Sequence, residues 1–262
     1  ETLSMPVMVC MDGFILTHAY ERMDVPDQEQ VDRFLPPFEP RQVLDPADPK
    51  SIGAMVGPEA FTEVRYIAHH KQMQALKVIP QIAEEFKGIF GRDSGGLIST
   101  YRADDADTLI VTLGSVIGTI SEVIDEMRDK GQKIGAVTIR SFRPFPLDEI
   151  HEVLKNTRRV VVFEKCLAVG LGGIVASNVR MAHRGQTSPV YTVIGGLGGR
   201  PITRASLQEL FEKAMTDDLE ETTFLDLKQD VVDQEMEREK KFSRSGAIAE
   251  NILRDVGVVD VA

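Results

Sequence analysis

Three glycine-rich turns are the first places in this sequence where a ligand could bind. They cover residues 114–118, 170–173 and 195–199. We expect them at the carboxyl ends of parallel strands, where helix N-termini offer free amides and a positive dipole end to a phosphate or carboxylate. Gly114 and Ser115 are therefore our candidate cofactor-binding residues. The turns match neither the dinucleotide-binding nor the Walker A pattern, and tight turns with positive φ also explain their glycines.

Two arginines, Arg140 and Arg143, lie on the expected loop after the strand of residues 134–139. Guanidinium groups bind carboxylates and phosphates in a two-pronged geometry, so this loop could clamp an anionic ligand. The same arginines could equally pair with acidic residues across a subunit contact. Both interpretations stay open, and Arg140 and Arg143 are our candidates for a subunit interface.

The tripeptide Glu164-Lys165-Cys166 ends another expected strand. A catalytic carboxylate and lysine are one interpretation, and an internal ion pair is the favoured one. Cys166 has no evident histidine partner, which argues against a nucleophile. His69 and His70 lie next to each other in an expected helix, where neighbouring side chains point about 100° apart and do not share a metal easily. The residue patterns thus single out no catalytic residue and no metal ligand.

Composition excludes several functions. The 262 residues carry a formal net charge of −11, which argues against nucleic-acid and anionic-lipid partners. Two cysteines are too few for an iron–sulfur cluster or a cysteine-rich zinc site, and we expect free thiols in a reducing cytoplasm. No run of 18 apolar residues predicts a membrane span, and no basic leader precedes the first apolar run, so we expect a cytoplasmic protein.

The elements that would position these residues alternate between strands and helices. The alternation predicts an α/β fold, a mostly parallel sheet with helices on both faces. Strands are expected at residues 108–113, 134–139, 159–164 and 190–194, and helices at residues 115–130, 146–154, 172–182 and 203–215. We expect Ser115 and Thr203 to be the N-caps of the first and last of these helices, and Gly131 to end the first one.

The first hundred residues have a different character. Residues 6–11 (Pro-Val-Met-Val-Cys-Met) predict a strand whose sheet partners we expect upstream, so the sequence reads as a fragment. Residues 25–58 are rich in proline, and we expect an extended strap without regular structure, docked on a folded body, rather than a free linker. Residues 59–90 predict one long helix that Pro80 kinks or splits.

The C-terminal segment is acidic. Residues 216–262 hold 13 acidic and 6 basic residues, so they contribute −7 of the net charge. A helix expected over residues 231–242 carries few large apolar side chains. We expect an arm that packs on a neighbour or is poorly ordered alone.

Several motifs, in order, resemble 2-oxoacid:ferredoxin oxidoreductase α subunits, with the pyruvate synthase (pyruvate:ferredoxin oxidoreductase) branch as the best fit. The stretch of residues 6–21, PVMVCMDGFILTHAYE, is similar to that family's "VMVxxDGFxxSHxxE" motif. Residues 25–29, 34–37, 44–46, 113–115, 140–146 and 195–200 match later motifs. Asp12 and His18 join the two loop arginines as candidates for a subunit interface.

The resemblance implies thiamine diphosphate-dependent oxidative decarboxylation of a 2-oxoacid, with electrons passed through iron–sulfur clusters to ferredoxin and the acyl group passed to coenzyme A. It implies four parts: a remnant of the thiamine pyrimidine-binding domain (residues 1–24), a strap and long helix (25–103), a domain like the transketolase C-terminal domain with one antiparallel edge strand (104–215), and the acidic arm (216–262). Nothing here matches the family's activating glutamate, so no catalytic residue is assigned.

Two main functions follow for testing. The first is a non-catalytic C-terminal portion of such an α subunit, supporting assembly with a thiamine diphosphate-binding β subunit, γ and ferredoxin-like subunits, ferredoxin, and possible further copies of itself. Thiamine diphosphate, Mg²⁺, clusters and coenzyme A would then be bound by the whole complex and not by this portion. The alternative is a stand-alone module that binds a phosphate or carboxylate at Gly114 and Ser115. A third interpretation, the β subunit of a lipoamide-linked 2-oxoacid dehydrogenase, is disfavoured by the strap motifs.

Overall fold

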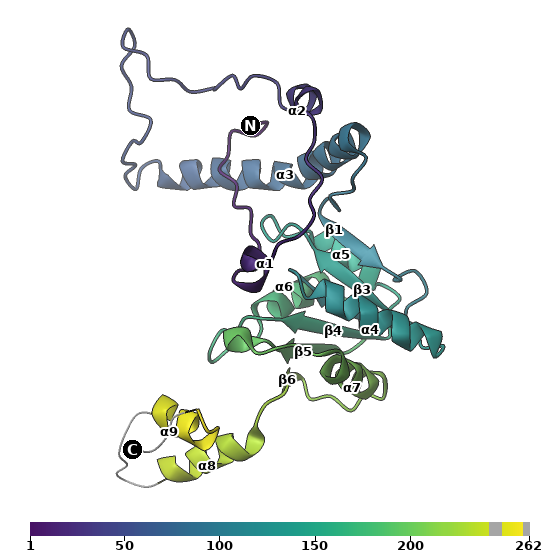
Figure 1. Ribbon diagram of the computed structural model, residues 1–262. Helices are drawn as coiled ribbons and strands as arrows, with labels where there is room; N and C mark the ends of the chain where they lie inside the picture. Colours follow the sequence, from purple (N-terminus) through teal and green to yellow (C-terminus); the bar gives the residue numbers. More distant parts are fainter. Residues whose placement is uncertain (241–247, 259–262) are drawn as a thin grey trace. The chain divides into compact units, whose positions relative to one another are not determined.

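The computed structural model describes residues 1–240 and 248–258. The chain divides into two compact units, Glu1–Thr223 and Phe224–Ala262. The first unit contains nearly all of a six-stranded sheet with the strand order β1-β3-β2-β4-β5-β6 (Figure 1). The strands are β1 (Ile98–Tyr101), β2 (Thr108–Thr112), β3 (Ile134–Ile139), β4 (Arg159–Glu164), β5 (Val190–Ile194) and β6 (Thr222–Phe224).

Four strands form the parallel centre of the sheet. β2 lies between β3 and β4, and β5 pairs with the far side of β4. β1 pairs with β3 in the antiparallel sense, with Ile98 opposite Ile139. The predicted α/β fold is confirmed. The one antiparallel edge strand agrees with the expected architecture of a transketolase C-terminal-like domain.

Helices cover both faces of this sheet because its central strands are apolar on both sides. The helices are α4 (Ile117–Asp129), α5 (Leu147–Leu154), α6 (Ile174–Ala182) and α7 (Arg204–Met215). α5 and α6 pack together on one face, where Leu109, Val137 and Val162 join Leu154 and Val179 in a buried cluster. α4 and α7 pack together on the opposite face (Figure 1).

The predicted helix ends hold with one exception. Thr203 caps α7 by accepting a hydrogen bond from the Ser206 amide at 3.1 Å, and Gly131 follows α4 at φ +81°. The expectation that Ser115 caps α4 is wrong. Val116 occupies the N-cap position without a side-chain bond, because the Ser115 hydroxyl is bonded to Asp12 instead.

The predicted strand of residues 6–11 does not form. These residues are extended coil, followed by the short helix α1 (Ile15–His18), and Val7, Met8 and Val9 are 79%, 88% and 93% exposed. A strand needs a neighbour that pairs with its backbone, and the six-stranded sheet does not include this segment. The apolar side chains of this segment are therefore not buried.

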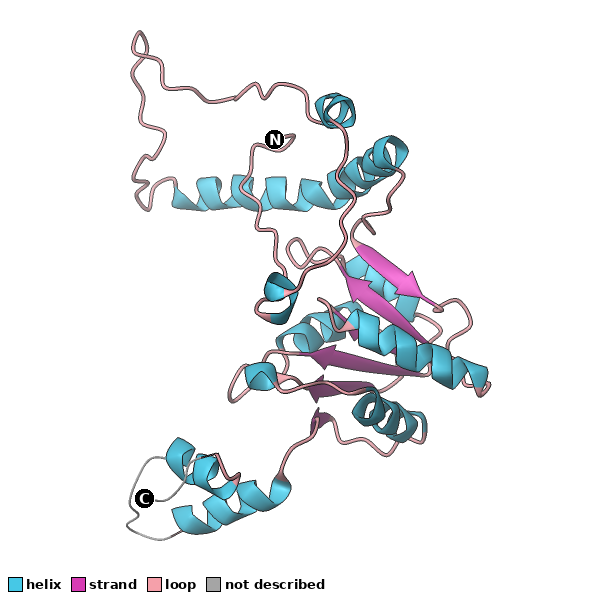
Figure 2. Cartoon of the chain, viewed as in Figure 1, coloured by secondary structure: helices cyan, strands magenta, loops and turns pink. Residues whose placement is uncertain are grey.

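The proline-rich strap contains more regular structure than expected. Residues 28–34 form helix α2 (Gln28–Phe34), which Asp27 caps by accepting from the Gln30 amide at 2.8 Å. The Phe34 ring packs edge-on against Phe86 and Phe90, at centroid distances of 5.5 and 5.4 Å. The strap is thus docked at α2. Its later residues form a long loop (Figure 2), in which Phe38, Val43 and Leu44 are exposed.

The predicted long helix is confirmed as α3 (Phe61–Phe90). It continues through Pro80 as one element, so the expected split does not occur, and the ribbon bends toward its C-terminal part (Figure 1). The bend is the usual consequence of a proline that cannot donate its hydrogen bond within a helix. No helix in the described ranges has both the length and the apolarity that a membrane span requires.

The second unit contains helices α8 (Gln229–Glu239) and α9 (Ile248–Asp255). Arg238 of α8 donates to both carboxylate oxygens of Asp255, at 2.5 and 2.9 Å, and to Glu235 at 3.2 Å. α8 agrees with the helix predicted near residues 231–242, although Phe242 lies outside the described residues. The sequence reasoning missed α9.

Candidate functional site

The Asp12 carboxylate lies on the predicted anion-binding turn. Its Oδ2 accepts a hydrogen bond from the Ser115 backbone amide at 2.7 Å and a second bond from the Ser115 hydroxyl. Its Oδ1 lies 3.0 Å from the Lys165 Nζ. We call this group, Asp12 with Ser115 and Lys165, the Asp12 clasp. The turn thus holds a carboxylate of the chain itself, and the binding of a cofactor at Gly114 and Ser115 stays a prediction.

The sheet explains why these residues meet. Ser115 follows β2 and Lys165 follows β4, and these neighbouring parallel strands end at the same edge. Gly114 adopts φ +83°, and a Cβ built there would lie 3.1 Å from Asp12 Oδ2. Glycine therefore permits both the turn and the close approach of the carboxylate. No local sequence pattern predicts this pairing, because Asp12 and Ser115 are 103 positions apart.

Hydrogen bonding keeps Asp12 ionised. Its pKa falls from 3.8 to about 2, chiefly because the Ser115 hydroxyl and then the Ser115 amide donate to the charged form, with a smaller contribution from Lys165. The side chains of Asp12 and Lys165 keep only 26% and 33% of their surface exposed, so solvent screens this pair less than an open surface pair. The carboxylate acts as an acceptor here and is unsuited to proton transfer near neutral pH.

A second carboxylate, Glu164, lies one residue from the clasp but faces the interior. It is 3% exposed and accepts from the amides of Val175 and Ala176 at 2.8 and 2.9 Å. These amides open α6, so the carboxylate stabilises the positive end of that helix. The expected internal pair of Glu164 with Lys165 does not form, because adjacent strand residues point to opposite sides and Lys165 bonds to Asp12.

Cys166 donates its thiol hydrogen to Glu164 Oε2 at 2.9 Å. Burial, together with this bond and the nearby negative charge, raises the pKa of the Cys166 thiol from 9.0 to about 11. A thiol with a raised pKa is a poor nucleophile. This agrees with the expectation that Cys166 is not catalytic.

The other candidate residues lie apart from the clasp. The Arg140 Nε donates to the Ser99 hydroxyl at 3.3 Å, and the Arg143 guanidinium lies 4.3 Å from the Phe142 ring centroid and donates to the Phe142 carbonyl. His18 Nδ1 lies 2.7 Å from the Phe14 carbonyl oxygen within α1. The structure therefore brings Asp12 together with Gly114 and Ser115. The roles of Arg140, Arg143 and His18 at an interface stay predictions.

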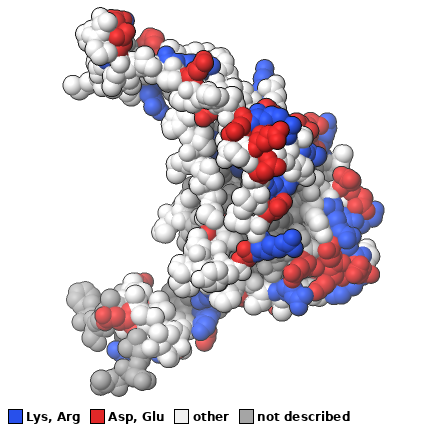
Figure 3. Space-filling model, turned by 45° about the horizontal axis from the view of Figure 1, so that its top comes forward, with Lys and Arg blue, Asp and Glu red and all other residues white. Residues whose placement is uncertain are grey.

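No metal site appears among the described residues, where no group of three or more His, Cys, Asp or Glu side chains has the necessary arrangement. His69 and His70 lie on α3, where His70 stacks on Tyr66 at a centroid distance of 6.4 Å. Lys, Arg, Asp and Glu side chains interleave on the face of the molecule in Figure 3, which shows no broad patch of one sign.

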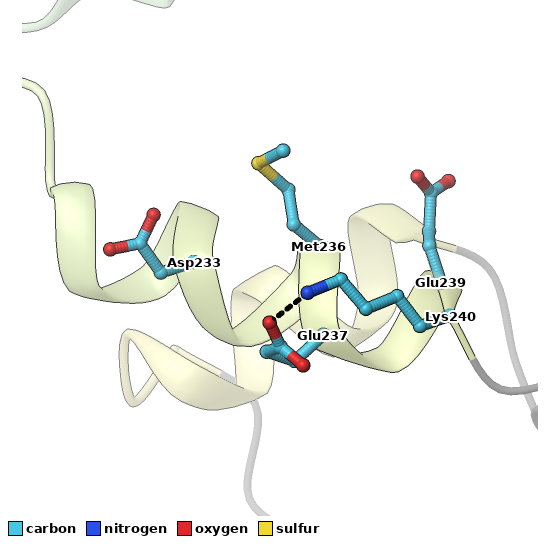
Figure 4. A pocket seen from close by; sticks show the side chains of 5 residues that line it. All are labelled: Asp233, Met236, Glu237, Glu239 and Lys240. Carbon is cyan, nitrogen blue, oxygen red and sulfur yellow. Dashed lines mark hydrogen bonds and ion pairs between the residues drawn. The ribbon is translucent and has the colours of Figure 1, made fainter.

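Two surface hollows are lined by residues other than those of the Asp12 clasp. One, of about 570 Å³, lies along α8 and is lined by Asp233, Met236, Glu237, Glu239 and Lys240 (Figure 4). Lys240 pairs there with Glu237, so the hollow offers mainly charged groups on a single helix. The other, of about 440 Å³, includes Arg180, His183 and Tyr191. The Arg180 guanidinium already donates to the Val190 carbonyl at 3.1 Å and to Glu221 at 3.4 Å.

Comparison with known proteins places these segments in a family. Residues 1–84 match the model "Pyruvate flavodoxin/ferredoxin oxidoreductase, thiamine diP-bdg", and residues 106–207 match "Pyruvate:ferredoxin oxidoreductase core domain II". The chain belongs to the pyruvate:ferredoxin oxidoreductase family. Within that family it is of the α-subunit type, and the clasp joins the N-terminal matched segment (residues 1–84) to the segment that matches core domain II (residues 106–207), which we call domain II.

Curated relatives support the assignment. The chain is 39% identical to pyruvate synthase subunit PorA of Methanosarcina barkeri over 88% of its own length and 59% of the relative. It is 42% identical to the same subunit of Methanothermobacter thermautotrophicus over 80% of its length and 54% of the relative. It is 35% identical to ketoisovalerate oxidoreductase subunit VorA of Pyrococcus horikoshii over 81% and 55%. The chain thus spans about half the length of the curated relatives it matches.

Proposed function

We propose that this chain is the C-terminal, non-catalytic portion of the α subunit of a pyruvate (2-oxoacid):ferredoxin oxidoreductase, and that it supports subunit assembly. The reaction is the thiamine-dependent oxidative decarboxylation of pyruvate to acetyl-CoA, with electrons passed to ferredoxin. One observation carries the proposal: a well-filled domain II lies beside an N-terminal segment (residues 1–84) in which many apolar residues are exposed. Such a segment is suited to contact further protein.

The cysteines of this chain do not fit an iron–sulfur cluster. An iron–sulfur cluster requires about four cysteine thiolates, whereas the chain has only Cys10, which is exposed, and Cys166, which is half-buried. We propose that thiamine diphosphate, Mg²⁺, the clusters and coenzyme A are bound elsewhere in the complex.

The partners in this proposal are a thiamine diphosphate-binding β subunit, γ and ferredoxin-like subunits, and ferredoxin. We propose the four-part division at residues 24, 103 and 215 as the working map for assembly experiments. A cytoplasmic location is proposed on the two free thiols, which suit a reducing compartment.

The test compares the isolated chain with the assembled complex. Both preparations are assayed for reduction of a viologen dye that depends on pyruvate and coenzyme A. The complex is expected to turn over and the isolated chain is not. A parallel assay with 2-ketoisovalerate tests the substrate, because the curated relatives include both pyruvate and ketoisovalerate enzymes. Turnover by the isolated chain contradicts the non-catalytic role.

The alternative, a stand-alone anion-binding module, has less support. Its proposed site at Gly114 and Ser115 is occupied by the Asp12 carboxylate. Calorimetry with coenzyme A and thiamine diphosphate separates the two functions. Tight binding of either compound by the isolated chain, abolished by Ser115→Ala, would favour the module.

A further inference from the structure

We propose that Asp12 is a positioning residue: its carboxylate fixes the N-terminal segment around it (residues 6–20) on the carboxyl edge of the domain II sheet. The inference rests on the proposed function for its catalytic consequence, but the positioning itself is a property of this chain. No other feature of residues 1–24 joins three parts of the sequence at one point. The contacts of Asp12 span 103 positions to Ser115 and 153 positions to Lys165.

The geometry of the clasp suits a specific attachment. One oxygen of the carboxylate receives the Ser115 amide and hydroxyl, and the other receives the Lys165 ammonium. Hydrogen bonds to an ionised acceptor are about twice as strong as neutral ones, and a backbone amide fixes direction as well as distance. A carboxylate held on both oxygens defines the position of the segment more narrowly than a single surface ion pair.

The residues around Asp12 give the segment little apolar attachment. Met11 and Phe14 are 71% and 77% exposed, so neither side chain enters the core. Arg41 donates to the Thr2 carbonyl at 2.9 Å and Arg92 donates to the Asp24 carbonyl at 3.2 Å, and both arginines lie outside the sheet. The position of residues 6–20 on domain II therefore depends on the polar contacts of Asp12.

Position matters for the reaction that we propose. In the assembled enzyme, residues 1–84 belong to the thiamine-binding region, and residues 106–207 form domain II. A loose connection at Asp12 would let the first region shift on the second. Small displacements of groups that hold a cofactor or substrate reduce the rate even when the changed residue is distant from the reacting atoms.

The experiment measures the position of the segment directly. Cys10 is exposed and lies two residues from Asp12, whereas the Cys166 thiol is half-buried and bonded to Glu164, so a nitroxide reagent labels Cys10 selectively. A second label is placed at Glu122→Cys on α4, where the native side chain is 65% exposed. Pulsed dipolar spectroscopy on the full chain then gives the distribution of distances between the two labels.

We expect a narrow distribution in the parent protein and in Lys165→Arg, which keeps the charge. Asp12→Asn and the double variant Ser115→Ala with Lys165→Met should both broaden it. Asp105→Asn is the matched control, because this carboxylate pairs with Arg128 elsewhere on domain II. A distribution that stays narrow in Asp12→Asn overturns the proposal. So does a parent distribution as broad as that of the variant.

Kinetics of the assembled complex test the consequence. Asp12→Asn is expected to lower kcat on the order of tenfold while the complex still assembles on a sizing column, and Asp105→Asn is expected to leave kcat unchanged. A broadened distance with an unchanged kcat would overturn the catalytic part of the inference. An inactive parent complex would instead contradict the proposed function, while the distance measurement would still decide the positioning.

Discussion

The β4 strand and the segment of residues 6–11 have similar apolar sequences and opposite environments. In β4, Val160, Val161 and Val162 have no exposed surface, because β2 and β5 flank the strand and helices cover it. In the N-terminal segment, Val7 and Val9 are largely exposed, since no strand within residues 1–240 or 248–258 pairs with it. A continuous apolar run therefore gives a segment the capacity for burial, whereas its neighbours in the fold determine whether burial occurs.

The largest expected effect tests this contrast with one truncation in each region. Phe163→Ala removes a fully buried ring from β4 and should lower the free energy of unfolding by about 3–5 kcal/mol. Val9→Ala, at a side chain that is 93% exposed, should change it by less than about 0.5 kcal/mol. Urea denaturation followed by far-ultraviolet circular dichroism measures both, because the chain has no tryptophan. Equal losses would show that the N-terminal segment is packed after all.

The second largest expected effect tests the buried Glu164 carboxylate, which lies at the same sheet edge as the partly exposed Asp12 carboxylate. A Cβ at Gly173 would lie 2.1 Å from Glu164 Oε1, so Gly173→Ala must displace the buried helix cap. We expect a loss of about 1–3 kcal/mol in stability, by the same denaturation assay.

Gly118→Ala provides the matched control for that substitution. Gly118 lies in α4 with open space around its Cβ position, so alanine there should raise stability by about 0.5–1 kcal/mol. The same substitution, glycine to alanine, is thus expected to lower the free energy of unfolding at residue 173 and to raise it at residue 118. A destabilising Gly118→Ala together with a neutral Gly173→Ala would contradict the described packing of Glu164.

Thiol reactivity compares the two regions without a mutation. Cys10 is exposed, whereas burial and the Glu164 bond raise the pKa of the Cys166 thiol to about 11. A disulfide reagent at pH 8 should therefore modify Cys10 first and leave Cys166 largely unmodified until the protein unfolds. Peptide mapping by mass spectrometry identifies the modified thiol. Preferential modification of Cys166 would contradict its environment.

The smallest expected effect is the pH dependence of the Asp12 clasp. The folded state lowers the pKa of Asp12 from 3.8 to about 2, so its contribution to stability is fully present above about pH 5 and is lost as the pH falls through 3.8 and about 2. The difference in stability between the parent protein and Asp12→Asn should therefore shrink between about pH 5 and pH 2. A difference that stays constant over this interval would show that Asp12 is not held by hydrogen bonds in its charged form.

The sequence alone predicted domain II well. The bounds of β4 and β5, the cap at Thr203 and the helices between the strands follow from continuous apolar runs and local capping chemistry, which depend on near neighbours in the chain. The structure shows the Asp12 carboxylate at Ser115, whereas cofactor binding at Gly114 and Ser115 stays a prediction. The role of Ser115 as a helix cap was wrong, because a distant carboxylate competes for its hydroxyl.

Three features of the structure depend on contacts between residues that are distant in the sequence. The strand predicted at residues 6–11 lacks a partner, helix α2 forms in the strap because Phe34 packs on α3, and Glu164 caps α6 across 11 positions instead of pairing with Lys165. Proline content suppressed the prediction of α2, although its cap at Asp27 was readable in the sequence.

The sequence by itself determined the family, the alternation of strands and helices, and the glycine turn at residues 114 and 115, because each is encoded in short stretches of residue types. Only the tertiary structure decided what occupies that turn and which apolar run is buried. Parallel strands bring residues more than a hundred positions apart to one edge, and the free energy of a carboxylate or a valine depends on the groups that finally surround it.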